Sequence, residues 1–223
     1  MGLGDERLIR SEAMERTVRV LMEYSRLIRE YRADKLELVA TAAVREALNR
    51  EEMARRVEAG AGLVMRTISG KEEARLSYLG VVQGLGQVSP ETLVIDVGGG
   101  STEFIWSTAM GQVQLESVAV GAVRATESCW GPAEITQKLA EVLNRVSGTG
   151  ARQVVGVGGT ATTLAAMELG LVQYDPDKVH GSEISRSRVA AWGEKLQALD
   201  SEGRKNIPGL QPQRSDIIIA GIN

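Results

Sequence analysis

The hydrophobic and polar positions of residues 1–86 alternate between helical and extended patterns. A helix is predicted from Ser11 to about Tyr31, because apolar residues recur at helical spacing after Ser11, a good N-cap. Strands are predicted at Lys35–Ala40 and Leu63–Ile68, and further helices at Val44–Leu48, Glu51–Ala59 and Glu72–Val82. The last two helices are expected to end at the pairs Gly60/Gly62 and Gly84/Gly86. This alternation is typical of a parallel-sheet α/β architecture.

The pattern changes after a stretch rich in glycine and proline, Gly86–Pro90, where we expect a boundary between a first lobe (1–88) and a second lobe (89–223). Strands at Leu93–Val97, Glu103–Thr108 and Gln112–Val120, with a turn at Met110-Gly111, predict an antiparallel meander. The remaining elements expected are a helix at Pro132–Val146, a short buried strand at Arg152–Gly156, a helix ending at Gly170, a helix at Arg188–Leu199 and an apolar strand at Ile217–Ala220.

Composition narrows the class of protein. The 223 residues are 43% hydrophobic and 25% charged, as in a globular protein with a substantial core. Cys129 is the single cysteine, which rules out an internal disulfide and suits a reducing cytosol. No apolar run approaches the roughly 20 residues of a membrane span, so we expect a cytoplasmic protein that binds no membrane. The net charge of -3 argues against a nucleic-acid partner.

The stretch Leu93–Trp106, LVIDVGGGSTEFIW, carries the first candidate chemistry. An apolar strand delivers Asp96 into three glycines, which are followed by two hydroxyl residues and Glu103. Glycines allow successive backbone N–H groups to converge on an anion, and hydroxyls add further donors. The stretch therefore predicts a phosphate-binding turn with Asp96 holding a cation at its base. The alternative is an ordinary glycine-rich hairpin.

A second glycine turn, Gly156–Ala161, follows a strand and opens a helix. It fits the dinucleotide fingerprint G-x-G-x-x-A, with Asp175 or Asp177 near the spacing of a ribose-binding acid. Alternatively, Gly158, Gly159 and Thr160 form a second phosphate-facing loop at the positive end of the helix, or the glycines serve close helix–strand packing. Neither loop is a P-loop, because the chain lacks G-K-[ST] there.

Several charged or titratable residues could have either a functional or a purely structural role. Glu72 and Glu73 begin a helix, where carboxylates commonly complement the helix dipole. Arg45 follows Thr41 at a strand-to-helix junction, where a guanidinium either clamps a phosphate or is simply solvated. His180 has no cysteine or histidine companions at metal spacing, so a turn or hydrogen-bonding role is expected rather than metal ligation.

Four stretches together resemble one family: Ala40–Asn49, Ile68–Val81, Leu93–Trp106 and Val154–Met167, with Val179–Gly181 and the terminal SDIIIAG as weaker support. The chain is similar to the exopolyphosphatase and guanosine pentaphosphate phosphatase family, of the actin-like ATPase and sugar kinase fold superfamily. The resemblance implies an α/β, actin-like (ribonuclease H-like) fold of two lobes with mixed sheets and an active site in the cleft between them.

The resemblance also implies a reaction and its residues. The reaction is hydrolysis of the terminal phosphoanhydride of polyphosphate or guanosine pentaphosphate, with Mg²⁺. Glu73 would be the catalytic base and Arg45 would contact phosphate. Asp96 and Glu103 would handle metal and water. The first loop would bind phosphate through Gly98, Gly99, Gly100 and Ser101.

The chain departs from the family in one respect. Family members open with a phosphate loop of D-x-G-x-x-S type, which this chain lacks, so we expect an incomplete first lobe with exposed strand edges and a possible homodimer. A non-catalytic actin-like module that binds phosphate or nucleotide is the main alternative function. Others are a nicotinamide-dependent oxidoreductase that uses the second turn, and an ATP-dependent kinase of the same superfamily, which leaves Glu72-Glu73-Ala74 unexplained.

Overall fold

The computed structural model describes residues 7–86, 88–89, 91–107 and 112–223. The chain consists of two compact units, Met1–Glu73 (unit 1) and Ala74–Asn223 (unit 2). The expected lobe boundary between residues 88 and 89 stays a prediction. Pro90, at the end of that boundary stretch, and the Met110-Gly111 turn lie outside the described residues. Among the helices that the structure describes, none is both long and apolar enough to cross a membrane.

Unit 1 combines helices with a two-stranded parallel sheet. Its elements are α1 (Ser11–Glu30), β1 (Leu38–Ala40), α2 (Ala42–Glu46), α3 (Arg50–Ala61), β2 (Met65–Thr67) and the start of α4 (Gly70–Leu85). Leu38 pairs with Met65 and Ala40 with Thr67, which confirms the parallel arrangement predicted for this part of the chain. Both strands are shorter than expected, at three residues each.

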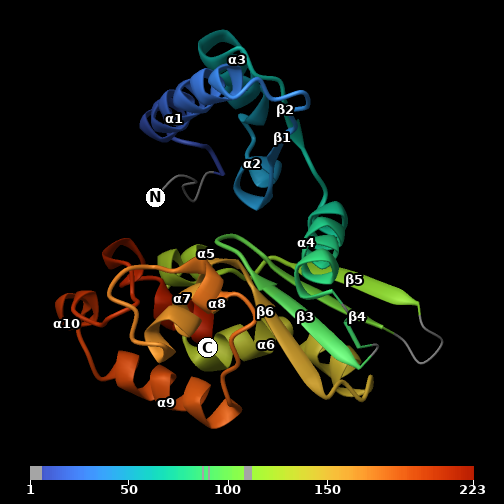
Figure 1. Cartoon of the computed structure of the whole chain (residues 1–223), viewed down its shortest axis with the longest axis vertical. Coiled ribbons are helices and arrows are strands. Elements are labelled where there is room, and N and C mark those ends of the chain that lie inside the picture. Colours follow the sequence, from blue (N-terminus) through green and yellow to red (C-terminus); the bar gives the residue numbers. More distant parts are fainter. Residues whose placement is uncertain (1–6, 87, 90, 108–111) are drawn as a thin grey trace. The chain divides into compact units, whose positions relative to one another are not determined.

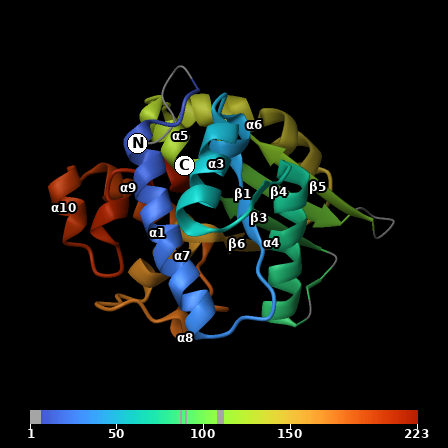
Figure 2. The ribbon, with the colours of Figure 1, turned by 90° about the horizontal axis from the view of Figure 1, so that it is seen from above.

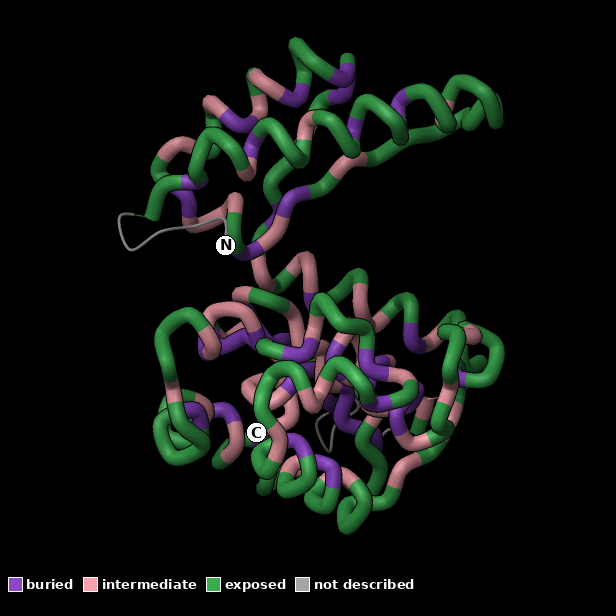
Figure 3. The backbone as a smooth tube through the Cα atoms, turned by 90° about the vertical axis from the view of Figure 1, so that its left-hand side faces the viewer, coloured by how far each residue is buried: buried purple, intermediate pink, exposed green. Residues whose placement is uncertain are grey.

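The core of unit 1 lies between α1 and α3, which run side by side (Figure 2). The fully buried side chains Met14 and Val57 come from one helix each. Buried and exposed segments alternate along both helices (Figure 3), as amphipathic helices require. Gly60 belongs to α3, where a Cβ would lie 2.5 Å from Val18 Cγ1, so its glycine serves helix packing rather than helix termination. Gly62 ends the helix in the left-handed conformation, at φ 68°.

Unit 2 is built around a four-stranded mixed sheet of order β5-β4-β3-β6 (Figure 1). Its elements after α4 are β3 (Thr92–Val97), β4 (Thr102–Ser107), β5 (Val113–Val118), α5 (Ala122–Glu127), α6 (Pro132–Ser147), β6 (Gln153–Val157), α7 (Gly158–Glu168), α8 (Pro176–Val179), α9 (Arg186–Gln197), α10 (Ser201–Lys205), the 3₁₀ turn η1 (Pro212–Arg214) and α11 (Ile218–Ile222). Strands β3, β4 and β5 form the predicted antiparallel meander, and β6 joins β3 in parallel.

Alternating residues of β3 and β4 cover the two faces of this sheet. Val94 and Ile105, both fully buried, pack against Ala74 and Val81 of α4. On the opposite face, Leu93, Phe104 and Trp106 pack against Val142 and Val146 of α6. Asp96 lies two residues after Val94 on β3, and Glu103 lies two residues before Ile105 on β4. Because alternate residues of a strand share a face, both side chains lie on the face that α4 covers.

The apolar segment at Ile217–Ala220, expected to be a strand, is instead the helix α11. Its isoleucines favour a strand by local preference, but Ile218 is 1% exposed and packs with Trp192 and Leu196 of α9, and this tertiary packing prevails. The strand expected to be buried, β6, lies at the edge of the described sheet, and Val154 is 62% exposed. Helix α5 was not expected at all.

Smaller differences concern helix ends. Arg10 occupies the N-cap position of α1, and Ser11 is the first helical residue, its hydroxyl donating to Glu15 Oε1 at 3.4 Å. Helix α4 runs past the predicted end, so Gly84 lies inside it, and Gly86 follows with φ 76°. Differences of one or two residues at helix ends are usual; the interior glycine is explained by a contact described below.

Candidate active site

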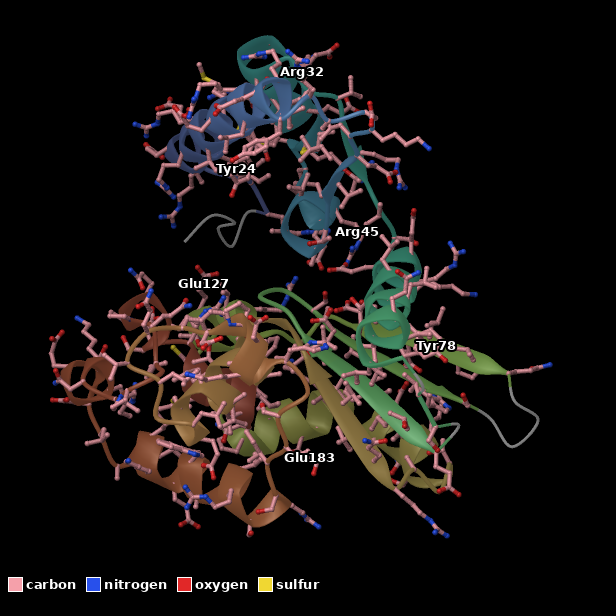
Figure 4. All side chains as sticks on the ribbon, in the orientation of Figure 1. Tyr24, Arg32, Arg45, Tyr78, Glu127 and Glu183 are labelled. Atoms are coloured by element: carbon pink, nitrogen blue, oxygen red, sulfur yellow. The ribbon has the colours of Figure 1, made fainter. Side chains whose placement is uncertain are left out.

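Arg45 and Glu73 are brought together by the two parallel strands of unit 1. Helix α2 begins just after β1, and α4 begins shortly after β2, so both helices start at the carboxyl edge of the same small sheet. Arg45 lies on α2 (Figure 4), and its Nη1 donates to Glu73 Oε2 at 2.9 Å and to the Ile68 carbonyl at 3.1 Å. The two side chains are 23% and 17% exposed, so they form a largely shielded ion pair.

The neighbouring Glu72 has different surroundings. Its Oε1 accepts from Arg66 Nη1 at 2.7 Å, and Arg66 Nη2 also donates to Glu37 Oε1 at 2.6 Å. Hydrogen bonds to the carboxylates of Glu37 and then Glu72 raise the pKa of the Arg66 guanidinium. The backbone N–H of Glu72 also donates to Ser69 Oγ, which stabilises the start of α4. Glu72 is thus a structural surface carboxylate, whereas Glu73 is paired with a second predicted site residue.

The first glycine loop lies between β3 and β4 and is closed by a hydrogen bond from the Gly98 N–H to the Ser101 carbonyl, at 3.0 Å. Within the described residues, the N–H groups of Gly99 and Gly100 donate to no protein acceptor. These two donors are therefore available to an anion. Ser101 is only 2% exposed, and its role as a phosphate ligand stays a prediction.

Helix α5 contacts this loop through the loop's carbonyl groups. The Gly98 carbonyl accepts from the Ala122 N–H, the Gly99 carbonyl from the Arg124 N–H, and the Gly100 carbonyl from Arg124 Nε at 2.8 Å. At the N-cap of α5, a Cβ on Gly121 would lie 2.6 Å from the Gly99 carbonyl carbon. Because its carbonyls are held on one side, the loop presents its N–H groups in a fixed arrangement.

Asp96 and Glu103 are direct cross-strand partners on the face covered by α4. Ser77 of α4 donates its hydroxyl to Asp96 Oδ2 at 2.5 Å, and Ser117 of β5 donates to Glu103 Oε1 at 2.6 Å. Asp96 is partly buried, whereas Glu103 is 1% exposed. The two carboxylates are therefore neighbours, with Asp96 the more accessible one, and their role with metal and water stays a prediction.

The second glycine loop reaches Asp96 from β6. Gly158 has φ 84°, and a Cβ on it would lie 2.6 Å from Asp96 Oδ1 and 3.1 Å from the Val97 carbonyl oxygen. Only glycine allows this approach. Gly156 allows β6 to pack closely on α7, since its Cβ would lie 2.9 Å from Ala161 Cβ. The second loop thus combines close helix–strand packing with close approach to an acidic group.

Arg214 is a cationic group at this loop that sequence reasoning missed. Its guanidinium occupies the space that a side chain on Gly159 would take, at the first turn of α7. A lone arginine after a proline in η1 carries no recognisable signal in the sequence. Thr160 is 6% exposed and lies against α11, where a Cβ on Gly221 would come within 2.5 Å of Thr160 Oγ1. Its role as a phosphate ligand stays a prediction.

Other candidates have structural roles. Asp175 Oδ1 accepts from the N–H groups of Asp177 and Lys178, so it caps α8. The Lys178 side chain, and these backbone bonds after it, lower the pKa of the Asp175 carboxyl. Cys129 is exposed. In the part of the chain that the structure describes, no three histidine, cysteine or acidic side chains gather closely enough to hold a metal by themselves.

Comparison with known proteins agrees with this architecture. The model of the Ppx/GppA phosphatase family matches residues 2–223. Exopolyphosphatase 2 of Mycobacterium tuberculosis is 31% identical over 230 residues, which cover 94% of this chain and 71% of that protein.

Solved structures confirm the α/β, actin-like fold class. A Ppx/GppA family member from Aquifex aeolicus is 33% identical with a TM-score of 0.76, over 98% of this chain and 74% of that one. An exopolyphosphatase from Cytophaga hutchinsonii, at 22% identity, shares the fold with a TM-score of 0.82 over 99% of this chain and 76% of that one. The resemblance drawn from four sequence stretches is thereby confirmed: the chain belongs to the Ppx/GppA phosphatase family.

Proposed function

We propose that this protein is an exopolyphosphatase-type hydrolase that releases the terminal phosphate of inorganic polyphosphate or of guanosine pentaphosphate. Membership of a phosphatase family and the likeness to an exopolyphosphatase support a hydrolase that acts on phosphoanhydride bonds. One observation carries the assignment to this site. Asp96 accepts a hydrogen bond from Ser77 of α4 and is the cross-strand partner of Glu103. It lies one residue before the end of β3, beside the first glycine loop, and comes close to Gly158 of the second loop.

The two loops suit phosphoryl transfer. The barrier to this reaction is lowered mainly by holding the groups in line and neutralising charge on the phosphoryl oxygens. Hydrogen-bond donors for the phosphoryl oxygens are available at the N–H groups of Gly99 and Gly100 and at the first turn of α7. The Arg214 guanidinium adds a positive charge. Gly98 contributes by closing its loop.

Glu73 would act as the general base that orients and deprotonates the attacking water. Arg45 holds one carboxylate oxygen, Oε2, and so fixes the orientation of the group, leaving Oε1 to accept the proton. Arg45 would also contact the substrate through its remaining N–H groups. General-base assistance of this kind accelerates a reaction by about 10²–10⁴-fold.

Magnesium is the proposed cofactor. Mg²⁺ prefers oxygen ligands and is usually held by one or two carboxylates together with substrate phosphates and water. Asp96 fits this role as a partly buried carboxylate between the two loops, with Glu103 beside it as the second carboxylate. When bound, the metal would neutralise charge on the phosphate oxygens.

The test is release of inorganic phosphate from long-chain polyphosphate and from guanosine pentaphosphate, each with and without Mg²⁺. We expect Mg²⁺-dependent release from at least one substrate, lost on chelation and restored by added metal. Release from neither substrate, together with retained binding of polyphosphate, would instead identify a non-catalytic phosphate-binding module. The expected cytoplasmic location and the possible homodimer stay predictions, and light scattering in solution tests the latter.

A further inference from the structure

From Ala74 onward, helix α4 belongs to unit 2 and contacts the rest of that unit at successive points. It is continuous from Gly70 to Leu85. Ala74 and Val81 pack on Val94 and Ile105 of the sheet, and Ser77 is hydrogen-bonded to Asp96. These contacts fix α4 up to Val81, and its last turn is contacted by one further side chain.

That side chain belongs to His180. Its Nε2 lies 3.0 Å from the carbonyl oxygen of Gly84, in the last turn of α4. A carbonyl oxygen only accepts, so Nε2 carries the proton and donates. The last carbonyls of a helix have no partner within the helix, so this bond satisfies one of them.

The contact also explains the interior glycine of α4. A Cβ on Gly84 would lie 3.0 Å from His180 Cε1, so the ring would have to move by a few tenths of an ångström to admit it. Gly80, one turn earlier on the same helix, has nothing within 4 Å of its Cβ position. Of these two glycines, only Gly84 is required by a neighbour.

His180 is itself held firmly, although its ring is exposed. Its backbone N–H donates to the Pro176 carbonyl at 2.8 Å, at the end of the short helix α8. The preceding residue, Val179, is 7% exposed and packs against Ala165 and Ala166 of α7. Because α7 begins at the second glycine loop, His180 connects that loop's helix to the last turn of α4, the helix that carries Ser77.

We infer that His180 is a positioning residue: its bond to Gly84 sets the direction of the part of α4 that belongs to unit 2, and thereby the location of Ser77 and of the Asp96 carboxylate to which Ser77 donates. The inference rests on the proposed function of Asp96. Gly84 lies seven residues beyond Ser77, or about 10 Å along the helix. Without the bond, the last turn of α4 is released and the helix can shift on the sheet, which moves Ser77 relative to Asp96.

The test compares steady-state kinetics of phosphate release for four single variants and one double variant. His180→Ala removes the donor and is expected to lower kcat about tenfold with KM within about twofold, a smaller loss than the roughly 10²-fold attributed to a 1 Å misplacement. His180→Gln places an amide N–H at the same number of bonds from Cβ and is expected to restore most of kcat. Gly84→Ala is expected to resemble His180→Ala, because its methyl group displaces the ring.

Gly80→Ala is the matched control. Both glycine-to-alanine changes raise the helix propensity of α4 equally, but only Gly84→Ala disturbs His180, so Gly80→Ala should keep the kcat of the unaltered protein. In the His180→Ala background, Gly84→Ala should have no further effect on kcat, since the group it displaces is gone.

Hydrogen exchange separates this inference from the proposed function. Amides in the last turn of α4 should exchange faster in His180→Ala than in the unaltered protein or in His180→Gln, whatever the substrate. If the unaltered protein releases no phosphate, the proposed function fails while exchange still tests the contact. Equal exchange and equal kcat in His180→Ala and the unaltered protein would overturn the inference, as would equal losses in Gly84→Ala and Gly80→Ala.

Discussion

Two adjacent glutamates at the start of α4 share their chemistry and differ in their surroundings. Glu73 is paired with Arg45 in a largely shielded position, and Glu72 is paired with the more exposed Arg66. Exposed ion pairs contribute little to stability. The two residues therefore offer a comparison in which the type of side chain is constant and only the position differs.

Glu73→Gln should reduce phosphate release by about 10²–10⁴-fold, because the amide cannot accept a proton from water. Its oxygen can still accept the hydrogen bond from Arg45, so polyphosphate binding should be nearly unchanged. Glu72→Gln is the control and should keep normal release. Initial-rate kinetics and a binding titration provide the measurements, and full activity in Glu73→Gln would refute the assignment of the base.

A second residue-scale prediction concerns pH. Hydrogen bonds from Arg188, and then from Trp192, lower the pKa of Glu168 below its ordinary value of 4.5. A lowered folded-state pKa stabilises the protein above the unfolded pKa, and this contribution is lost as the pH falls through the folded value. The thermal stability advantage over Glu168→Gln should thus be largest near neutral pH and shrink below about pH 5. An advantage that does not change down to pH 3 would contradict this.

At the scale of elements, the second glycine loop makes a sharp prediction. Gly158→Ala introduces a methyl group 2.6 Å from Asp96 Oδ1, whereas Gly170 has a similar φ of 62° and nothing within 4 Å. Both substitutions incur the cost of a left-handed backbone, about 1–2 kcal/mol. Only Gly158→Ala should also lower phosphate release, by at least about tenfold, through displacement of Asp96. Melting temperatures and kinetics of both variants test this, and similar activities would contradict it.

The local sequence pattern predicted some of these elements correctly and others not. The meander was predictable because turn signals separate three strands of matching period, and β3, β4 and β5 pair as expected. Helix α11 could not be predicted from local pattern. The segment Ile217–Ala220 is helical because it packs with Trp192 and Leu196, which lie more than 20 residues away in the sequence. The exposure of β6 depends on its place in the sheet order, which residue spacing does not encode.

The candidate site was partly predictable for the same reason. Asp96, Glu103 and the glycines stand within one short stretch, so their proximity follows from a single hairpin. Arg45 and Glu73 were each assigned a role by resemblance, but their contact was not predicted, because it depends on the parallel pairing of β1 with β2. Arg214 and Ser77 were missed because each reaches the loops from a distant segment, without any local motif.

At the scale of the whole molecule, the two units have separate hydrophobic cores, so each unit should unfold locally with its own free energy. The cluster around Met14, Met53 and Val57 belongs entirely to unit 1, while the sheet of unit 2 has clusters of its own on both faces. The strands described in unit 1, from residue 7 onward, are two of three residues each. Amides of α1 and α3 should therefore exchange through local unfolding of lower free energy than those of β3 and β4.

Met53→Ala tests this independence. Removal of a buried methionine side chain costs about 2–5 kcal/mol, which should speed exchange in α1 and α3 and leave β3 and β4 unchanged. Ile105→Ala should do the reverse, since Ile105 is fully buried in unit 2. Equal acceleration of both sets of amides by either variant would show that the chain unfolds as one cooperative body.

Helix α4 restricts how this protein can be divided or recombined. The two compact units meet at Glu73, one turn inside a helix that begins at Gly70. A cut at that boundary would deprive the helix of its Ser69 contact and leave the proposed base on one piece and Ser77 on the other. A chimera that exchanges one unit with a relative should therefore be joined before Ser69, so that the whole helix travels with the sheet on which it packs.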